Sequence, residues 1–287
     1  MKNIFIFFAL FVFKLVFSQS YHDTQGKLDI TNSGQAVFTV PIAIPPSLQN
    51  VGPTINLIYG SGQFGGVIGQ GWNINSISMI SRMASSIHVD GFVDGVDFDD
   101  NDKLALDGQR LILKSGNYWD NGSIYQTEIQ SNNKIEQVNT GNNIYFIVTN
   151  TDGSRSWYGN YEGVNATDLT AYYITRFEDS HGNYIQYDYY KPFGKSLCIK
   201  EIKFSANIAG ILPLNKIIFN YKQAKRIETA YIKGIKHEKD ALLSSVEVKT
   251  NNQLFRKYEI THQEDSQLGY EKVTQIKELN GSGEIAN

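Results

Sequence analysis

The sequence predicts an all-β protein built from many short antiparallel strands in packed or curved sheets, with little helix. Apolar and polar residues alternate over runs of about four to eight residues, which is the period of a half-buried strand. The chain has 17 tyrosines and 16 phenylalanines but only 19% charged residues, a composition typical of sheets and turns. Pairs such as Asp107-Gly108 and Asp152-Gly153 separate the runs and indicate hairpin turns.

The first 18 residues predict a secretory signal peptide. Lys2 supplies a positive charge, and Ile4 to Phe13 is an apolar run too short to span a bilayer. Val16-Phe17-Ser18 carries tolerated residues before the cleavage point, so we expect cleavage near Ser18–Gln19. An uncleaved anchor is the alternative. The mature chain, residues 19–287, is then secreted into the extracellular space and has no transmembrane segment.

The stretch from Ala36 to Arg82 organises the rest of the chain. It holds four of the six prolines and, between Gly52 and Gly71, seven of the 25 glycines. Because proline cannot donate to a strand ladder, Pro41 and Pro45 predict a sheet edge or strand entrance. Gly69 and Gly71 predict a tight turn with positive φ that delivers Trp72 into a core. The apolar phase changes near Ser76, which predicts a β-bulge or a strand end there.

At these residues the chain resembles the N-terminal domain of the Salmonella virulence plasmid B protein and of the B components of insecticidal toxin complexes. The matching segments are Val40-Pro41-Ile42, Pro45-Pro46-Ser47, Pro53 to Tyr59, Ile68-Gly69-Gln70-Gly71-Trp72 and Ile80-Ser81-Arg82. Ser47 stands where the family has glycine, and Gly60-Ser61-Gly62 replaces a serine pair. The signature residues carried by the resemblance are Pro41, Pro45, Pro46, Pro53, Tyr59, Gly69, Gly71, Trp72 and Arg82.

The resemblance implies an exported, non-enzymatic scaffold module of a toxin-complex or Rhs-type assembly that encloses or delivers a toxic polypeptide. The implied partners are a downstream propeller or Rhs-type shell protein, or other toxin-complex subunits. The family domain is followed by a propeller and a shell, so this chain is expected to be truncated relative to the family. Two alternatives stay open. One is a secreted adhesin or glycan-binding β module with exposed Trp and Tyr; the other is a gene fragment without independent function.

An acidic stretch runs from His88 to Leu113 and contains seven aspartates. Asp97, Asp99 and Asn101 have the spacing that opens an oxygen-ligand calcium loop. Asp102 occupies the position that needs glycine, and position twelve of the loop is Gly108 instead of a bidentate glutamate. An EF-hand is therefore excluded. An irregular calcium site at Asp97, Asp99 and Asn101 remains a candidate, and a solvated acidic loop is the favoured alternative.

Further strands are expected along the rest of the chain. They are Ile124 to Tyr158 with internal turns, Tyr172 to Glu178, Tyr184 to Tyr190, Ile199 to Phe204, Lys216 to Tyr221, Ser244 to Lys249, Leu254 to Thr261 and Tyr270 to Glu278. The pattern of Gln223 to Ala230 is ambiguous and allows a short helix. Residues 19–287 form one family-like β domain, with two subdomains as an option and a boundary near residues 160–195.

Several kinds of chemistry are excluded. Gly60 to Gly65 matches the dinucleotide fingerprint by letter, but the glycines that follow oppose the helix that the fingerprint requires. The five histidines show no zinc spacing, and the single cysteine, Cys198, allows no internal disulfide. There is no nucleophile elbow and no Glu-x-Glu pair of the ADP-ribosyltransferase type. A net charge of −3 gives no case for nucleic acid. We expect no enzyme activity and no cofactor; two hidden glycosidase carboxylates are the remaining enzyme alternative.

Overall fold

The computed structural model describes residues 26–141, 143–264 and 267–286. The expected signal peptide and its cleavage point at Ser18–Gln19 lie outside these residues. The described chain contains strands β1 to β18 and two short helical pieces, η1 (Leu48–Asn50) and α1 (Ile87–Asp90). The predicted all-β class is therefore confirmed. Within the described residues, no helix has the length and apolar character needed to cross a membrane.

The first four strands form an antiparallel sheet in the order β1-β2-β3-β4. Their bounds are β1 (Lys27–Ile30), β2 (Ala36–Pro41), β3 (Asn56–Gly60) and β4 (Trp72–Asn75). The sheet edge or strand entrance predicted from Pro41 and Pro45 is not found: β2 is an inner strand between β1 and β3, and Pro45 lies in the irregular segment that follows β2. Pro41 is the last residue of β2, and the pairing with β1 already stops at Thr39. Proline is tolerated there because β1 no longer runs alongside.

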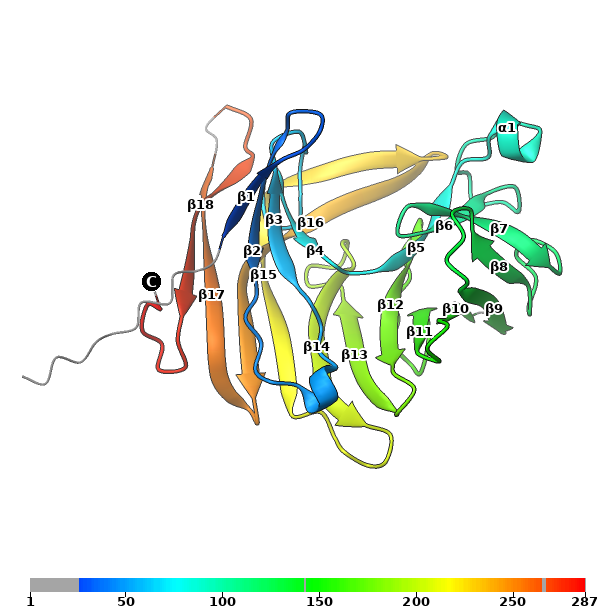
Figure 1. The fold of residues 1–287 in the computed structure, drawn as a ribbon. Helices are drawn as coiled ribbons and strands as arrows, with labels where there is room; N and C mark the ends of the chain where they lie inside the picture. The colour runs from blue at the N-terminus through cyan, green and yellow to red at the C-terminus, as the bar shows by residue number, and fades with distance from the viewer. Residues whose placement is uncertain (1–25, 142, 265–266, 287) are drawn as a thin grey trace, which may run out of the picture.

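The next eight strands close into a barrel, which lies on the right in Figure 1. They are β5 (Met79–Met83), β6 (Lys103–Leu106), β7 (Gln109–Ser115), β8 (Ile124–Thr127), β9 (Lys134–Thr140), β10 (Asn143–Thr149), β11 (Arg155–Gly159) and β12 (Ala171–Glu178). Closure depends on β12, which pairs with β5 and also with β11. Tyr125, Ile135 and Phe146 are 0% exposed. Such buried side chains make the barrel a packed core and not a channel.

A large curved sheet continues from the shared strand β12. Its other members are β13 (Asn183–Tyr190), β14 (Cys198–Asn207), β15 (Asn215–Ile232), β16 (Ile235–Thr250), β17 (Gln253–Glu264) and β18 (Glu271–Leu279). The sheet of β1 to β4 lies against this curved sheet (Figure 1), and Leu57, Phe204 and Val246 belong to the same buried core cluster. The hydroxyl of Tyr258 accepts a hydrogen bond from the Ala43 N–H at 2.9 Å. The two layers therefore form a sandwich fused to the barrel through β12.

Strands β15 and β16 are much longer than predicted, and Gln223 to Ala230 is strand, so the helix option is wrong. We call residues 224–239 the arm. It projects past the sheet toward the end of the barrel that carries α1 (Figure 1). Its side chains are mostly exposed on both faces, so the sequence there lacks the apolar alternation that a half-buried strand shows.

Local turn predictions agree with the structure. Asp107 and Gly108 have φ values of 49° and 82° and connect β6 to β7, as a type I′ hairpin turn requires. Strand β4 ends at Asn75, and Ser76 has a φ of 74°, which confirms the strand end predicted from the phase change. These features depend only on neighbouring residues, so the sequence pattern was sufficient to predict them.

Candidate functional site

The glycine-rich loop before β4 positions Trp72. Gly69 and Gly71 have φ values of 141° and 77°, which confirms the predicted positive φ. A Cβ atom on Gly71 would lie 2.7 Å from Cε2 of Tyr59, so glycine is also needed for space. The indole of Trp72 packs between Phe38 and Tyr59, with ring centroids 6.3 Å and 5.6 Å away. It is half-buried at the edge of the core and not enclosed in it.

The signature residues fall into three groups. The proline segment crosses the inner face of the curved sheet, where Pro45 and Pro53 are buried and the carbonyl of Pro46 accepts a hydrogen bond from Asn215 Nδ2 at 3.2 Å. Tyr59, Gly69, Gly71 and Trp72 come together around β3 and β4. Arg82 lies apart, in barrel strand β5.

Arg82 forms a buried ion pair at the end of the barrel. Its Nη1 lies 2.7 Å from Asp102 Oδ2, and the Asp102 side chain is 0% exposed. Asp102 also accepts hydrogen bonds from the backbone N–H groups of Asp97 and Phe98. The Arg82 guanidinium stacks over Trp119 at 4.2 Å from its ring centroid. Asp102 stands at the glycine position of the calcium-loop pattern, and that local pattern does not indicate a pairing with Arg82, 20 positions away.

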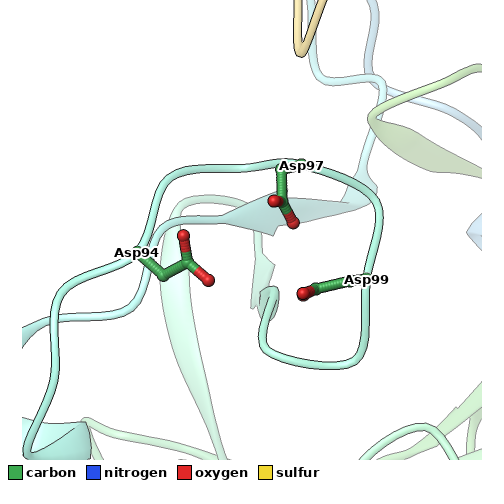
Figure 2. Close-up of side chains that lie close together, drawn as sticks. All are labelled: Asp94, Asp97 and Asp99. Carbon is green, nitrogen blue, oxygen red and sulfur yellow. The ribbon is translucent and has the colours of Figure 1, made fainter.

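The acidic loop brings three carboxylates together, as Figure 2 shows for Asp94, Asp97 and Asp99. One oxygen from each lies within 4.8 Å of the others. Asn101, the third residue of the predicted set, lies beside the cluster, where its side-chain amide donates to Asp99 Oδ2 at 3.2 Å. Asp94 joins Asp97 and Asp99, although it lies outside the calcium-loop spacing.

The cation next to this cluster comes from the chain itself. The Lys233 ammonium at the tip of the arm donates to Asp97 Oδ2. This hydrogen bond lowers the pKa of Asp97 and raises the pKa of Lys233. The tip of the arm therefore contacts the barrel at the acidic loop through this ion pair. Three carboxylates fit a divalent cation in donor type, but the lysine already supplies positive charge there.

A cavity of about 460 Å³ lies between the glycine-rich loop, the base of the arm and strands β12 to β15. Tyr173, Tyr189 and Tyr221 form its floor, together with Cys198. Burial raises the pKa of the Cys198 thiol to about 12, so the thiol stays protonated and is a poor nucleophile. Asp168 is held by the backbone N–H groups of Thr170 and Ala171, both at 2.9 Å. In this arrangement the Cys198 thiol and the Asp168 carboxylate contribute to the packing and hydrogen bonding of the fold.

The closed barrel and the sandwich together form a β module whose fold recurs in solved structures. The chain is similar to a chain in the crystal structure of TcdB2-TccC3, with a TM-score of 0.71 and 14% identity over 91% of this chain and 16% of that chain. The chain is also similar to a chain in the structure of the Photorhabdus luminescens Tc holotoxin pore, with a TM-score of 0.70 and 13% identity over 92% of this chain and 16% of that chain. The structure of the N-terminal domain of effector protein SpvB from Salmonella typhimurium strain LT2 is similar as well. Its TM-score is 0.64, with 15% identity over 83% of this chain and 98% of that chain. At these identities the likeness shows the fold.

Residues 30–196 match the family described as Salmonella virulence plasmid 65kDa B protein. The match covers more than half of the chain, which belongs to this family. No curated protein sequence matches the chain. The chain spans 16% of the toxin-complex chain to which it is similar.

Proposed function

We propose that this chain is a non-enzymatic scaffold module of a toxin-complex or Rhs-type assembly that encloses or delivers a toxic polypeptide. The fold shared with a toxin-complex chain over 91% of this chain carries the proposal. The module is only 16% of that longer chain, which fits a part that works by docking against others. Its partners would be a downstream propeller or Rhs-type shell protein, or other toxin-complex subunits.

The outer edge of β18 provides the physical support for docking. At one end of the edge, the Gln70 N–H donates a hydrogen bond to the Glu271 carbonyl. At the other end, the Ala286 N–H donates to the Glu278 carbonyl. Between them, within the part of the chain that the structure describes, no backbone hydrogen bond beyond the β17–β18 ladder holds Val273 to Ile276. An open strand edge accepts another strand.

An apolar groove of about 280 Å³ lies beside this edge, lined by Phe38, Trp72, Val273 and Ile276 among others. The groove would receive alternate side chains of an added strand while the edge binds its backbone. A partner strand that uses both would bury the Trp72 edge that the isolated chain leaves half-exposed. The signature tryptophan would then contribute to assembly as well as to folding.

The test is light scattering on purified residues 19–287. We expect the isolated chain to associate, and to become monodisperse with its downstream partner. Thr274→Lys places a charge at the open edge and should reduce association, whereas Thr229→Lys in the exposed arm is the matched control. A stable monomer with a sharp two-state melt and no binding of an apolar dye would remove the main physical support for an assembly part.

The packing of the tryptophans favours the scaffold over a glycan-binding module built on tryptophan. Trp157 is 5% exposed, Trp119 lies beneath Arg82, and Trp72 packs between two rings. A glycan platform needs an open aromatic face. We also infer export, because the virulence and toxin-complex relatives support extracellular delivery. N-terminal sequencing of secreted material should find Gln19, and Met1 would contradict the inference.

A further inference from the structure

The floor of the 460 Å³ cavity presents ring surfaces and no free hydroxyl groups. The Tyr189 hydroxyl donates to the Ile174 carbonyl at 2.8 Å, and the Tyr221 hydroxyl donates to the Ile199 carbonyl at 2.9 Å. The Tyr173 hydroxyl donates to Asp168 at 3.0 Å. Because all three hydroxyls are used within the protein, the floor offers an apolar, aromatic surface to any occupant.

The mouth of the cavity is polar and is formed by one face of the arm. Glu228 lies directly opposite Lys239, and Ala230 lies directly opposite His237. Cross-strand partners share a face, and so do residues two apart along a strand. Glu228, Lys239 and His237 therefore project from the same face, and all three line the cavity. Glu228 reaches the opposite wall, since a Cβ atom on Gly65 would lie 2.9 Å from its carboxylate oxygens.

These three side chains lack partners, in contrast to the other face of the arm. Among the described residues, neither a hydrogen bond nor an ion pair engages the side chain of Glu228, His237 or Lys239. On the opposite face, Lys236 lies 2.9 Å from Glu238, which Lys195 also contacts at 2.9 Å. Glu228 and Lys239 are opposite charges on paired residues, yet among the described residues no ion pair joins their side chains. Both charges remain available at the mouth.

We propose that this cavity binds a small zwitterion with an apolar body, namely an amino acid or a short peptide with a large aromatic or aliphatic side chain. The apolar body would lie on the tyrosine floor, the ammonium group would pair with Glu228, and the carboxylate would pair with Lys239. The volume is within the range of about 300–1,000 Å³ typical of small-ligand sites. Charge-assisted hydrogen bonds to both ends give such a ligand its orientation. The site is independent of the assembly role proposed above.

Isothermal titration calorimetry on the purified chain tests the proposal with L-phenylalanine and with the dipeptide phenylalanyl-leucine. The two ligands distinguish a free amino acid from a peptide. N-acetyl-L-phenylalaninamide has the same ring and neither charge, so it should bind at least about tenfold more weakly. Failure of both zwitterions to bind at millimolar concentration, or equal binding of the neutral analogue, overturns the proposal.

Two variants of the arm provide the matched comparison. Lys239→Ala should weaken binding of the zwitterion by about tenfold, because it removes the carboxylate partner. Lys236→Ala makes the same change on the opposite face and should leave affinity unchanged. Both side chains are exposed, so neither change should disturb the fold, which a melting curve verifies. If the two variants bind the zwitterion with equal affinity, Lys239 is not the partner of its carboxylate and the proposal is overturned.

Discussion

The barrel and the curved sheet are built from the same kind of alternating strand, but they treat their edges in opposite ways. In the barrel, β12 pairs with both β5 and β11, so the ring of hydrogen bonds closes. The curved sheet starts from the same β12 and ends at β18, whose outer edge is only partly covered. The open region holds the groove and the arm, and the cavity lies where this region meets the barrel, because Met79 of β5 and Tyr173 of β12 help to line it. Surfaces suited to partners therefore gather where the sheet does not close.

The two regions also differ in the interactions that stabilise them. The barrel has buried ion pairs, Arg82 with Asp102 and Arg110 with Asp90. The sandwich depends on the glycine-rich loop and on aromatic packing around Trp72. Both regions contain strand β12. Removing one stabilising interaction from each region shows whether the two regions unfold together.

The largest effect is expected in the barrel. Arg82→Leu should lower the free energy of unfolding by about 3–5 kcal/mol, because Asp102 would remain buried without its countercharge. Urea unfolding followed by fluorescence measures the change. Arg155→Leu removes the half-exposed partner of Glu178 and should cost under about 1 kcal/mol. If Arg82→Leu costs no more than Arg155→Leu, the ion pair does not fasten the barrel.

A somewhat smaller effect is expected in the sandwich. Trp72→Ala should cost about 3 kcal/mol, at the lower end for a large aromatic residue because the indole is half-buried. Thermal and urea unfolding measure it. A single transition for both Trp72→Ala and Arg82→Leu would mean that β12 couples the regions into one unit. A Trp72→Ala variant that melts like the wild type but loses a ligand would favour a binding module instead.

The next effect is a pH dependence located in the sandwich. Burial lowers the pKa of His262 below its ordinary value of 6.5, and its Nε2 lies 2.7 Å from the Ile68 carbonyl. The unfolded chain then binds the proton first, so stability is complete above pH 6.5 and falls as pH decreases toward the lowered folded pKa. Melting temperatures between pH 7.5 and 5 measure this slope. The His262→Gln variant should show a flatter dependence of melting temperature on pH. An unchanged slope in that variant would mean that another group causes the pH dependence.

The smallest effect is expected from calcium. The Lys233 ammonium already faces the carboxylate cluster, and the calcium loop lacks its glycine and its bidentate glutamate. Chelator should therefore leave the melting temperature unchanged, both in the wild type and in a Lys236→Ala control. Lys233→Ala exposes the cluster and is the variant in which calcium has its best chance to bind. A rise of several degrees on adding calcium to the wild type would show that a metal, not the lysine, fastens the arm.

Local features were within reach of the sequence by itself. The all-β class follows from alternation, and the turn at Asp107-Gly108 follows from residues that tolerate positive φ. The same reasoning predicted the positive φ of Gly69 and Gly71. The ordered motifs around Trp72 were enough to indicate the family. Each of these signals is complete within a short segment, because backbone conformation depends mainly on the residue and its immediate neighbours.

Only the tertiary structure decided how the strands meet. Barrel closure joins β5 to β12, and the arm brings Lys233 to Asp97, which is 136 positions away. The carboxylate cluster takes in Asp94, which lies outside the calcium-loop spacing. Asp102 became the partner of Arg82. A strand's alternation specifies which side chains face a core, but its backbone groups can pair with any strand of matching register. The choice among partners is made by the packing of the whole chain.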